Sequence, residues 1–333
     1  MGEVLLEGRR LHLAFAPRGG RGVPVFGQEG VVALCDVSVA VEAGEVVGVV
    51  GASGAGKSSL VKVLACLESA NAGEVYWQGL RVDHLPESQR RPFRHLVQVV
   101  FQEPGSSFNP RHTVGFALRE ALHRSKKRSG NDEAFQRERL TQLFSLVGLP
   151  FSEEMLSRRI FEFSGGQRQR LSLVRALAAE PKVLLLDEPV ASLDVPVRRR
   201  FLDSLAELVA STGLAVLLVT HDLSILDGLA SRVVVLLAGQ VVEEGPWGEV
   251  KRSPLHPYTR ALLDASENVL GFRHFFVPAP SGCPFRLACP WASPACLAKP
   301  RLEASGERRV ACFHPLSGNI SGEKLVQTQR EGG

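Results

Sequence analysis

Short apolar runs, separated by turns and amphipathic segments, form the basic pattern of this chain. Apolar and polar residues alternate through residues 31–50, with a break at Ala43-Gly44, which predicts short strands. The run VVGVV at 46–50 is wholly apolar, as is typical of a strand buried on both faces of a parallel sheet. A glycine-rich turn then leads into a helical pattern at 57–68.

Farther along the chain, amphipathic segments predict helices. Residues 131–147 have the spacing of an amphipathic helix, with Asn131 as its cap and Gly148 at its end. One face of this helix is apolar and comprises Leu140, Leu143, Phe144 and Val147. A further helix is predicted to begin at Ser164.

The following segments complete an α/β pattern. Apolar strands are predicted at 183–187 and 214–220 with a charged helix between them, and 233–245 has the pattern of a hairpin. Strands that alternate with helices favour a parallel sheet with helices on both sides. Near residue 246 the composition becomes rich in proline and aromatic residues, which we interpret as a domain boundary.

The composition is that of an ordinary globular protein and changes this picture little. The 333 residues are 44% hydrophobic and 22% charged, and the net charge is +4. A charge this small does not point to nucleic acid or to an anionic membrane as a partner. The amino terminus lacks the uninterrupted apolar stretch of a signal peptide, and the apolar runs are far shorter than the ~20 residues that cross a bilayer. We expect a cytosolic protein that meets a membrane only through partners.

The turn after the strand at 46–50 carries a phosphate-binding pattern. Its sequence, GASGAGKSS at 51–59, fits G-x-x-x-x-G-K-[ST] and lies between a strand and a helix, as that motif requires. Glycines let the backbone N–H groups point inward at phosphates, and the helix amino terminus adds partial positive charge. We expect Lys57 to reach the β- and γ-phosphates and Ser58 to bind Mg²⁺.

Two acidic residues end the strand predicted at 183–187. Ligands bind at the carboxyl ends of strands in open α/β sheets, so Asp187 can hold Mg²⁺ directly or through water. Glu188 follows directly and can orient and polarise an attacking water as a general base. Taken alone, the same residues could also be a solvated strand end.

The segment FSGGQRQR at 163–170 supplies a second anion site. Ser164 and two glycines open a helix whose first N–H groups have no partner within the helix. One ATP has a single γ-phosphate, and the loop at 51–59 already holds it. A second phosphate-binding helix end is explained if it serves a nucleotide that is held by another subunit.

Together these motifs resemble the ABC ATPase family, in which LSGGQ is the signature sequence. Phe163 here replaces the leading leucine, a change familiar in the peptide-importer branch. The resemblance covers about residues 3–265 and implies an α/β P-loop NTPase with an antiparallel β subdomain and a helical subdomain at about 103–175. A nucleotide-binding domain would span 1–245, and a small cysteine-rich extension would span 246–333.

The resemblance also implies roles for individual residues. Gln102 would contact Mg²⁺ and the water, and His221 would bind the γ-phosphate, so both join Glu188 as expected catalytic residues. The residues expected to bind the chain's own ATP are Gly51, Ser53, Gly54, Gly56, Lys57, Ser58, Ser59 and Phe15, with Phe15 stacking on adenine. Phe26 competes with Phe15 for that role. Mg²⁺ would be held by Ser58, Gln102 and Asp187. The residues expected to act in trans are Ser164, Gly165, Gly166, Gln167 and Asp194, the last within a D-loop at 191–194.

The family mechanism implies a set of partners. Two ATPase subunits, identical or paralogous, would close on two ATP molecules and move two transmembrane permease subunits. An extracytoplasmic solute-binding protein would deliver the solute to the permease subunits. The chain would lie on the cytoplasmic face of the membrane through the permeases. Segments 253–265 and 282–290 are similar to the C-terminal extension of oligopeptide, dipeptide and nickel importer ATPases. We therefore expect peptide import, with nickel or another small solute as the alternative cargo.

Other classes of function fit less well. Soluble ABC ATPases that act on DNA or ribosomes usually carry two cassettes, a long coiled coil or inserted zinc modules, and this chain has one uninterrupted cassette. A regulator that binds nucleotide without turnover is opposed by the presence of both Glu188 and His221.

Four cysteines lie together near the C-terminus: Cys283, Cys289, Cys296 and Cys312. A disulfide framework is not expected in a reducing cytosol, whereas four thiols can hold Zn²⁺ or a 4Fe–4S cluster. We favour iron–sulfur, because the spacing lacks the C-x2-C pairs of zinc ribbons and some members of the resembled family carry such a cluster here. A metal-free segment remains the third alternative.

Overall fold

The computed structural model describes residues 2–15, 31–103, 107–124, 133–191, 193–266 and 281–316. It divides into two compact units. The first unit comprises residues 1–9, 39–46 and 58–219, and the second comprises 10–38, 47–57 and 220–333. Each unit is described by itself.

The centre of the first unit is a set of parallel strands. Strand β7 (Val183–Asp187) pairs in parallel with β6 (Val97–Val100) on one side and with β8 (Ala215–Thr220) on the other. All residues of β7 and β8 are buried, which explains why both read as continuous apolar runs. The predicted strands at 183–187 and 214–220 are therefore confirmed, the second with a start one residue later.

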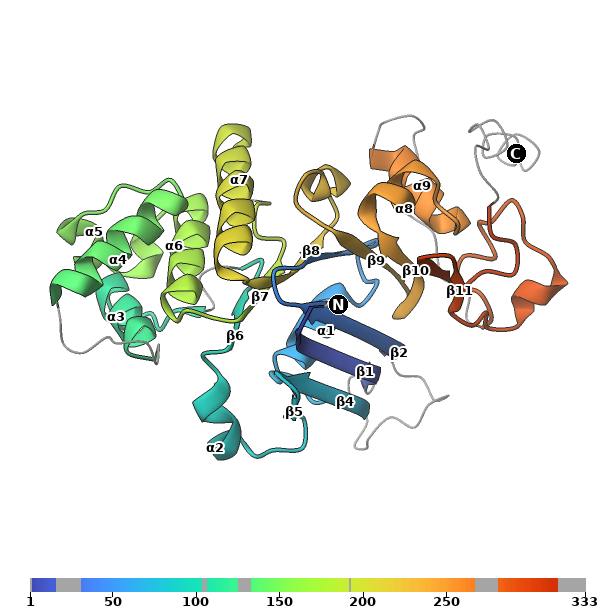
Figure 1. Cartoon of the computed structure of the whole chain (residues 1–333), viewed down its shortest axis with the longest axis horizontal. Helices are drawn as coiled ribbons and strands as arrows, with labels where there is room; N and C mark the ends of the chain where they lie inside the picture. Colours follow the sequence, from blue (N-terminus) through green and yellow to red (C-terminus); the bar gives the residue numbers. More distant parts are fainter. Residues whose placement is uncertain are drawn as a thin grey trace. The chain divides into compact units, whose positions relative to one another are not determined.

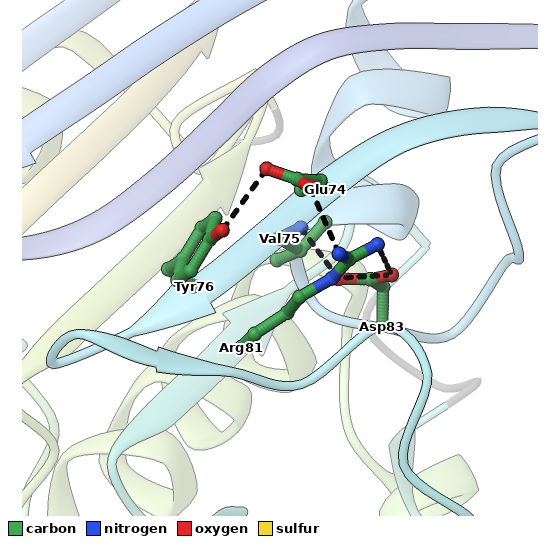
Figure 2. Close-up of polar contacts among 5 residues, drawn as sticks. All are labelled: Glu74, Val75, Tyr76, Arg81 and Asp83. Carbon is green, nitrogen blue, oxygen red and sulfur yellow. Dashed lines mark hydrogen bonds and ion pairs between the residues drawn. The ribbon is translucent and has the colours of Figure 1, made fainter.

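A second sheet has the strand order β2-β1-β4-β5, and its strands include residues of both units. Its strands are β1 (Val4–Phe15), β2 (Val31–Glu42), β4 (Ala72–Trp77) and β5 (Leu80–Arg81). Strands β4 and β5 are antiparallel, and polar side chains join them to the residues that follow (Figure 2). Arg81 donates to Glu74 over 2.8 Å and to Asp83 over 3.1 Å, and Asp83 also accepts the N–H of Val75 at 2.9 Å.

Helices α3 (Val114–Arg124), α4 (Glu133–Leu146), α5 (Glu153–Ser157) and α6 (Gly165–Ala178) pack together as one group (Figure 1). The apolar face predicted for residues 131–147 is buried in this group, and Gly148 ends α4 with a φ of 65°. Asn131 lies outside the described residues. The unit also contains α2 (Glu87–Arg90), α7 (Val195–Thr212) and the 3₁₀ turns Arg91–Phe93 and Ile160–Glu162.

Helix α1 (Lys57–Leu64) is shorter than the pattern at 57–68 predicts. The chain turns at Cys66, whose φ is 51°, and the N–H groups of Leu67 and Glu68 both donate to the carbonyl of Lys62. These hydrogen bonds satisfy the carbonyl oxygen of Lys62 in the last turn, and the helix ends there. The apolar run continues past the turn because Ala65 and Cys66 are buried there.

The second unit contains a mixed sheet. Strand β3 (Val46–Val50) pairs in parallel with β9 (Arg232–Leu237), and β9 pairs in antiparallel with β10 (Gln240–Pro246). The β9–β10 turn has φ values of 47° at Ala238 and 75° at Gly239, as expected for the two-residue hairpin turn that fits the twist of the strands. The predicted hairpin at 233–245 is confirmed.

The C-terminal residues return to this sheet. Strand β12 (Arg308–Val310) pairs in antiparallel with β10, with Glu243 opposite Val310, and β11 (Glu303–Ser305) pairs with β12. Helices α8 (Trp247–Arg252) and α9 (Pro257–Ser266) follow β10, and the 3₁₀ turns of the unit are Leu223–Leu226 and Pro294–Leu297. Within the described ranges, every helix is too short or too polar to cross a bilayer.

The contacts of Asp83 give a prediction about stability. Burial raises the pKa of Asp83, but the Arg81 guanidinium and the Val75 N–H outweigh it and hold the pKa below its usual value. Since the folded pKa is depressed, the carboxylate stabilises the fold above the unfolded-state pKa and loses that effect as the pH falls through the folded pKa. We expect Asp83→Asn to lower the free energy of unfolding by about 1 kcal/mol at pH 7.

Urea unfolding of both proteins at pH 7 and at about pH 3 would measure this effect. The difference between them should shrink at the lower pH, where the carboxyl group takes up a proton in the unfolded state before it does so in the folded state. A difference that is the same at both pH values would contradict the assignment.

Candidate nucleotide-binding site

The loop between β3 and α1, at residues 51–56, is packed so closely that two of its positions need glycine. A Cβ atom on Gly51 would lie 2.2 Å from the carbonyl oxygen of Leu236, and one on Gly56 would lie 2.2 Å from that of Ala33. The φ of Gly56 is 102°, which also disfavours any side chain. The backbone of the loop is therefore fixed against β9 and β2, while its tip at Ser53 and Gly54 is exposed.

Lys57 lies over the same loop. Its side chain is buried, and its Nζ atom donates to the carbonyl oxygens of Gly51 at 2.7 Å and Ala52 at 2.9 Å. A buried cation beside a curled, glycine-rich backbone at a helix amino terminus suits an anionic group such as phosphate. Ser58 is exposed and Ser59 is half-buried at the start of α1.

The two acidic residues at the end of β7 differ in their surroundings. Asp187 is the last residue of the strand and is only 4% exposed. Glu188 is half-buried, its φ is 52°, and its N–H donates to the carbonyl oxygen of Val219 at 3.0 Å. A left-handed backbone at a residue other than glycine is uncommon and is a feature of functional sites. The chain therefore turns sharply at Glu188, beside the carboxyl end of β8.

Ser164 is the N-cap of α6. Its Oγ atom accepts the N–H of Gln167 at 3.3 Å, and the Oε1 atom of Gln167 accepts the N–H of Ser164 at 3.0 Å, so both form a capping box. Ser164 and Gly165 are exposed, while Gly166 and Gln167 are half-buried. A helix end buried in the core of its own chain could not serve another subunit's nucleotide, and this one lies at the surface.

The other predicted residues are at element ends. Gln102 follows β6 and His221 follows β8, and both are exposed. Asp194 is the exposed N-cap of α7 and accepts the N–H of Val197 at 3.3 Å. Phe15 ends β1 with 42% of its surface exposed. Phe26, and Ser192 of the D-loop, lie outside the described residues.

The predicted residues are divided between the two units. Phe15, the loop through Lys57, and His221 belong to the second unit. The first unit contains the remaining set: Ser58, Ser59, Gln102, Ser164, Gly165, Gly166, Gln167, Asp187, Glu188 and Asp194.

Sequence reasoning missed one residue that touches the phosphate loop. The hydroxyl oxygen of Tyr258, on α9, accepts the N–H of Ala52 at 2.8 Å. The only signal in the sequence is an aromatic residue with a hydroxyl group, which the structure places in the second position of α9. A contact that joins residues 206 positions apart leaves no local pattern.

Of the four C-terminal cysteines, Cys283 and Cys296 are buried and Cys289 and Cys312 are half-buried. Burial raises the pKa of Cys283, of Cys289 to about 11 and of Cys312 to about 12. The N–H of Cys283 donates to the carbonyl oxygen of Cys296 at 2.9 Å. Among the described residues, no three His, Cys, Asp or Glu side chains are placed so that they could hold a metal ion.

Two family models match the chain. One, described as "ABC transporter", matches residues 34–191, and the other, described as "Oligopeptide/dipeptide transporter, C-terminal region", matches residues 242–296. The first spans the phosphate loop, the signature helix and the acidic pair. The second spans β10, α8, α9 and three of the four clustered cysteines.

The chain is also similar to curated proteins and to a solved structure. It is 35% identical to the oligopeptide transport ATP-binding protein OppF of Escherichia coli, over 93% of this chain and 96% of that protein. It is 37% identical to the di/tripeptide transport ATP-binding protein DppF of Pseudomonas aeruginosa, over 86% and 91%. The ATP-binding cassette MJ0796, in a dimeric post-hydrolysis state bound to ADP and Pi, matches 73% of this chain and 99% of its own at 26% identity and a TM-score of 0.63.

These similarities extend over both the cassette and the C-terminal region, and the predicted P-loop NTPase fold is confirmed. The chain belongs to the ATP-binding proteins of ABC transporters, in the oligopeptide/dipeptide transporter group.

Proposed function

We propose that this chain hydrolyses ATP to drive the import of oligopeptides or dipeptides across the cytoplasmic membrane. The main support for this proposal is the match of the oligopeptide/dipeptide transporter C-terminal region to residues 242–296, which follows the ABC transporter match at 34–191. Relatives that are similar over both regions are named for peptide transport. Import of nickel or another small solute by the same machinery has no comparable support.

The proposed active site follows from the chemistry of the residues. The loop backbone and Lys57 would hold the β- and γ-phosphates, and His221 would bind the γ-phosphate. Ser58, Asp187 and Gln102 would hold Mg²⁺, for which oxygen donors and a buried carboxylate at a strand end are suitable. Magnesium, when bound, would neutralise the charge on the phosphates. Glu188 would accept a proton from the water that attacks the γ-phosphorus.

The second half of each site is proposed to come from another subunit. The exposed amino terminus of α6, at Ser164 and Gly165, would face the γ-phosphate of a nucleotide bound by the partner, and Asp194 would lie near the same junction. The proposed assembly contains a second ABC ATPase, identical or paralogous, two permease subunits and a solute-binding protein. The chain would lie at the cytoplasmic face of the membrane, with residues 1–245 as nucleotide-binding domain and 246–333 as extension.

Replacement of the proposed base tests the chemistry. We expect Glu188→Gln to lower the ATPase rate of the assembled transporter at least about 100-fold, because the proton acceptor is lost. ATP should still bind and hold the closed pair of subunits, which size-exclusion chromatography with Mg–ATP would detect. The matched control is Glu207→Gln on the exposed face of α7, which should retain the normal rate. Normal turnover in Glu188→Gln would exclude Glu188 as the base.

A second pair of variants tests the role in trans. Ser164→Arg should leave Mg–ATP binding by the separated subunit within about twofold of normal, since its own nucleotide does not touch α6. The same variant should abolish ATPase activity of the assembled transporter. Lys57→Ala should weaken Mg–ATP binding by more than about tenfold, because a charge-assisted bond to phosphate is lost. Equal loss of binding in both variants, measured by calorimetry, would contradict a site shared between subunits.

The 4Fe–4S cluster, with Zn²⁺ as the alternative, remains a separate proposal for Cys283, Cys289, Cys296 and Cys312. Its support is the number and spacing of the thiols and the influence of the other three on the pKa of Cys312. Metal binding would require the thiols to rearrange and lose their protons. Metal analysis of protein purified without oxygen should find one cluster or one zinc per chain, and Cys296→Ser should lose it. Absence of both metals at stoichiometric level would remove the proposal.

A further inference from the structure

Tyr258 holds the backbone at the start of the phosphate loop. Its hydroxyl oxygen accepts the N–H of Ala52 at 2.8 Å. The carbonyl oxygen of the same residue accepts the Nζ atom of Lys57 at 2.9 Å. Ala52 is thus held through both of its backbone polar groups, by the Tyr258 hydroxyl at the N–H and by the Lys57 side chain at the carbonyl oxygen.

Tyr258 does not serve as a ligand for the nucleotide. Its side chain is only 3% exposed, and burial raises its pKa to about 12, so the hydroxyl group stays neutral at any physiological pH. Because the hydroxyl group is buried, neutral and hydrogen-bonded to the loop, it can hold the loop backbone in place. Tyr258 is therefore a positioning residue.

The amino terminus of α9 places Tyr258 rigidly. Glu243, which is fully buried on β10, accepts the N–H of Leu255 at 2.8 Å and that of His256 at 2.9 Å. The Nδ1 atom of His256 accepts the N–H of Tyr258 at 3.0 Å. These bonds satisfy N–H groups at the helix start that have no partner within the helix. Through these hydrogen bonds, the start of α9 with Tyr258 is attached to β10 of the β9–β10 hairpin.

The cysteine-containing segment supports the Tyr258 ring from another side. Phe285, two residues after Cys283, is 2% exposed, and its ring lies edge-on to that of Tyr258 with 5.5 Å between centroids. It also lies 6.3 Å from the ring of His256. Ring pairs at these distances are attractive beyond simple burial. A continuous set of contacts therefore runs from the C-terminal extension to the phosphate loop, inside one unit.

We propose that Tyr258 positions the phosphate loop for ATP, and that the C-terminal extension thereby sets the affinity of the cassette for nucleotide. The proposal rests on the proposed function only in that residues 51–58 bind the phosphates of ATP. Without the hydroxyl group, the N–H of Ala52 loses its partner, and the loop occupies its binding conformation for a smaller fraction of the time. The apparent dissociation constant rises by the inverse of that fraction.

The test is Tyr258→Phe in the assembled transporter, with Tyr76→Phe as the matched control. The chain has only these two tyrosines, and the hydroxyl of Tyr76 donates to Glu74 on β4, in the first unit (Figure 2). Loss of one neutral hydrogen bond should raise the KM for Mg–ATP about three- to tenfold in Tyr258→Phe. The kcat should change by less than about twofold, since binding of ground and transition states is weakened alike. Tyr76→Phe should change neither constant.

A second variant separates positioning from stability. Phe285→Leu keeps the Tyr258 hydroxyl group but removes the ring that packs on it, so the KM should rise in the same direction and by a smaller factor. All constants are measured well below the unfolding temperature of each variant. An unchanged KM in Tyr258→Phe, or a fall in kcat alone, would overturn the proposal. If Tyr258→Phe does not fold, an unchanged KM in Phe285→Leu would overturn it.

Failure of the proposed function has a different signature. If residues 51–58 did not bind ATP, the unaltered chain would bind no Mg–ATP in calorimetry. If ATP binds and is hydrolysed normally but the two variants match the control, the phosphate loop is correctly assigned and only the role of Tyr258 is wrong.

Discussion

The close packing of the phosphate loop is the constraint on which the rest of this molecule depends. Backbone N–H groups can converge on a phosphate only if the loop curls tightly, and here the curl brings Gly51 and Gly56 against carbonyl oxygens of β9 and β2. The buried Lys57 adds positive charge to a loop that is already fixed. The strands, the hairpin turn and the start of α1 can be understood as the support that this geometry requires.

A fixed backbone conformation also positions the acidic pair at the end of β7. A wholly buried strand brings Asp187 to the carboxyl end of the parallel strands. The left-handed backbone of Glu188 then turns the chain, and the Glu188 side chain is only half-buried. The bond from the N–H of Glu188 to β8 fixes that turn. Two neighbouring carboxylates thereby obtain different surroundings, and in the proposed mechanism this would let one strand end serve both a metal ion and a proton transfer.

The sequence was sufficient to predict the elements whose signal lies in neighbouring residues. The buried strands 46–50 and 183–187, the hairpin at 233–245 and the capped helix at Ser164 each carry their own signal in neighbouring residues, and each is confirmed. The end of α1 was wrong by four residues, since burial of Ala65 and Cys66 beyond the helix continues its apolar pattern.

Features that depend on distant residues could not be predicted. The bond between Tyr258 and Ala52 depends on how α9 packs, and no local spacing encodes it. Cysteine spacing counts possible ligands but does not determine whether thiols converge on one point, and among the described residues no three potential ligands are grouped for a metal ion. The roles proposed for Ser164 and Glu188 come from their sequence motifs and their chemistry. The structure adds how exposed the two residues are and which backbone conformation each has.

The pairing of β12 with β10 has a consequence for how the chain is made. Until residue 310 has left the ribosome, the outer edge of β10 has no strand to receive its hydrogen bonds. Exposed edges of apolar strands readily join strands of other molecules. Among the described residues the outermost strand of this sheet is β11, which is only three residues long and exposed. So short an edge strand offers few backbone groups for pairing with another molecule. Once β12 has been made and has paired, the outer edge of β10 is covered and is less able to associate with other molecules.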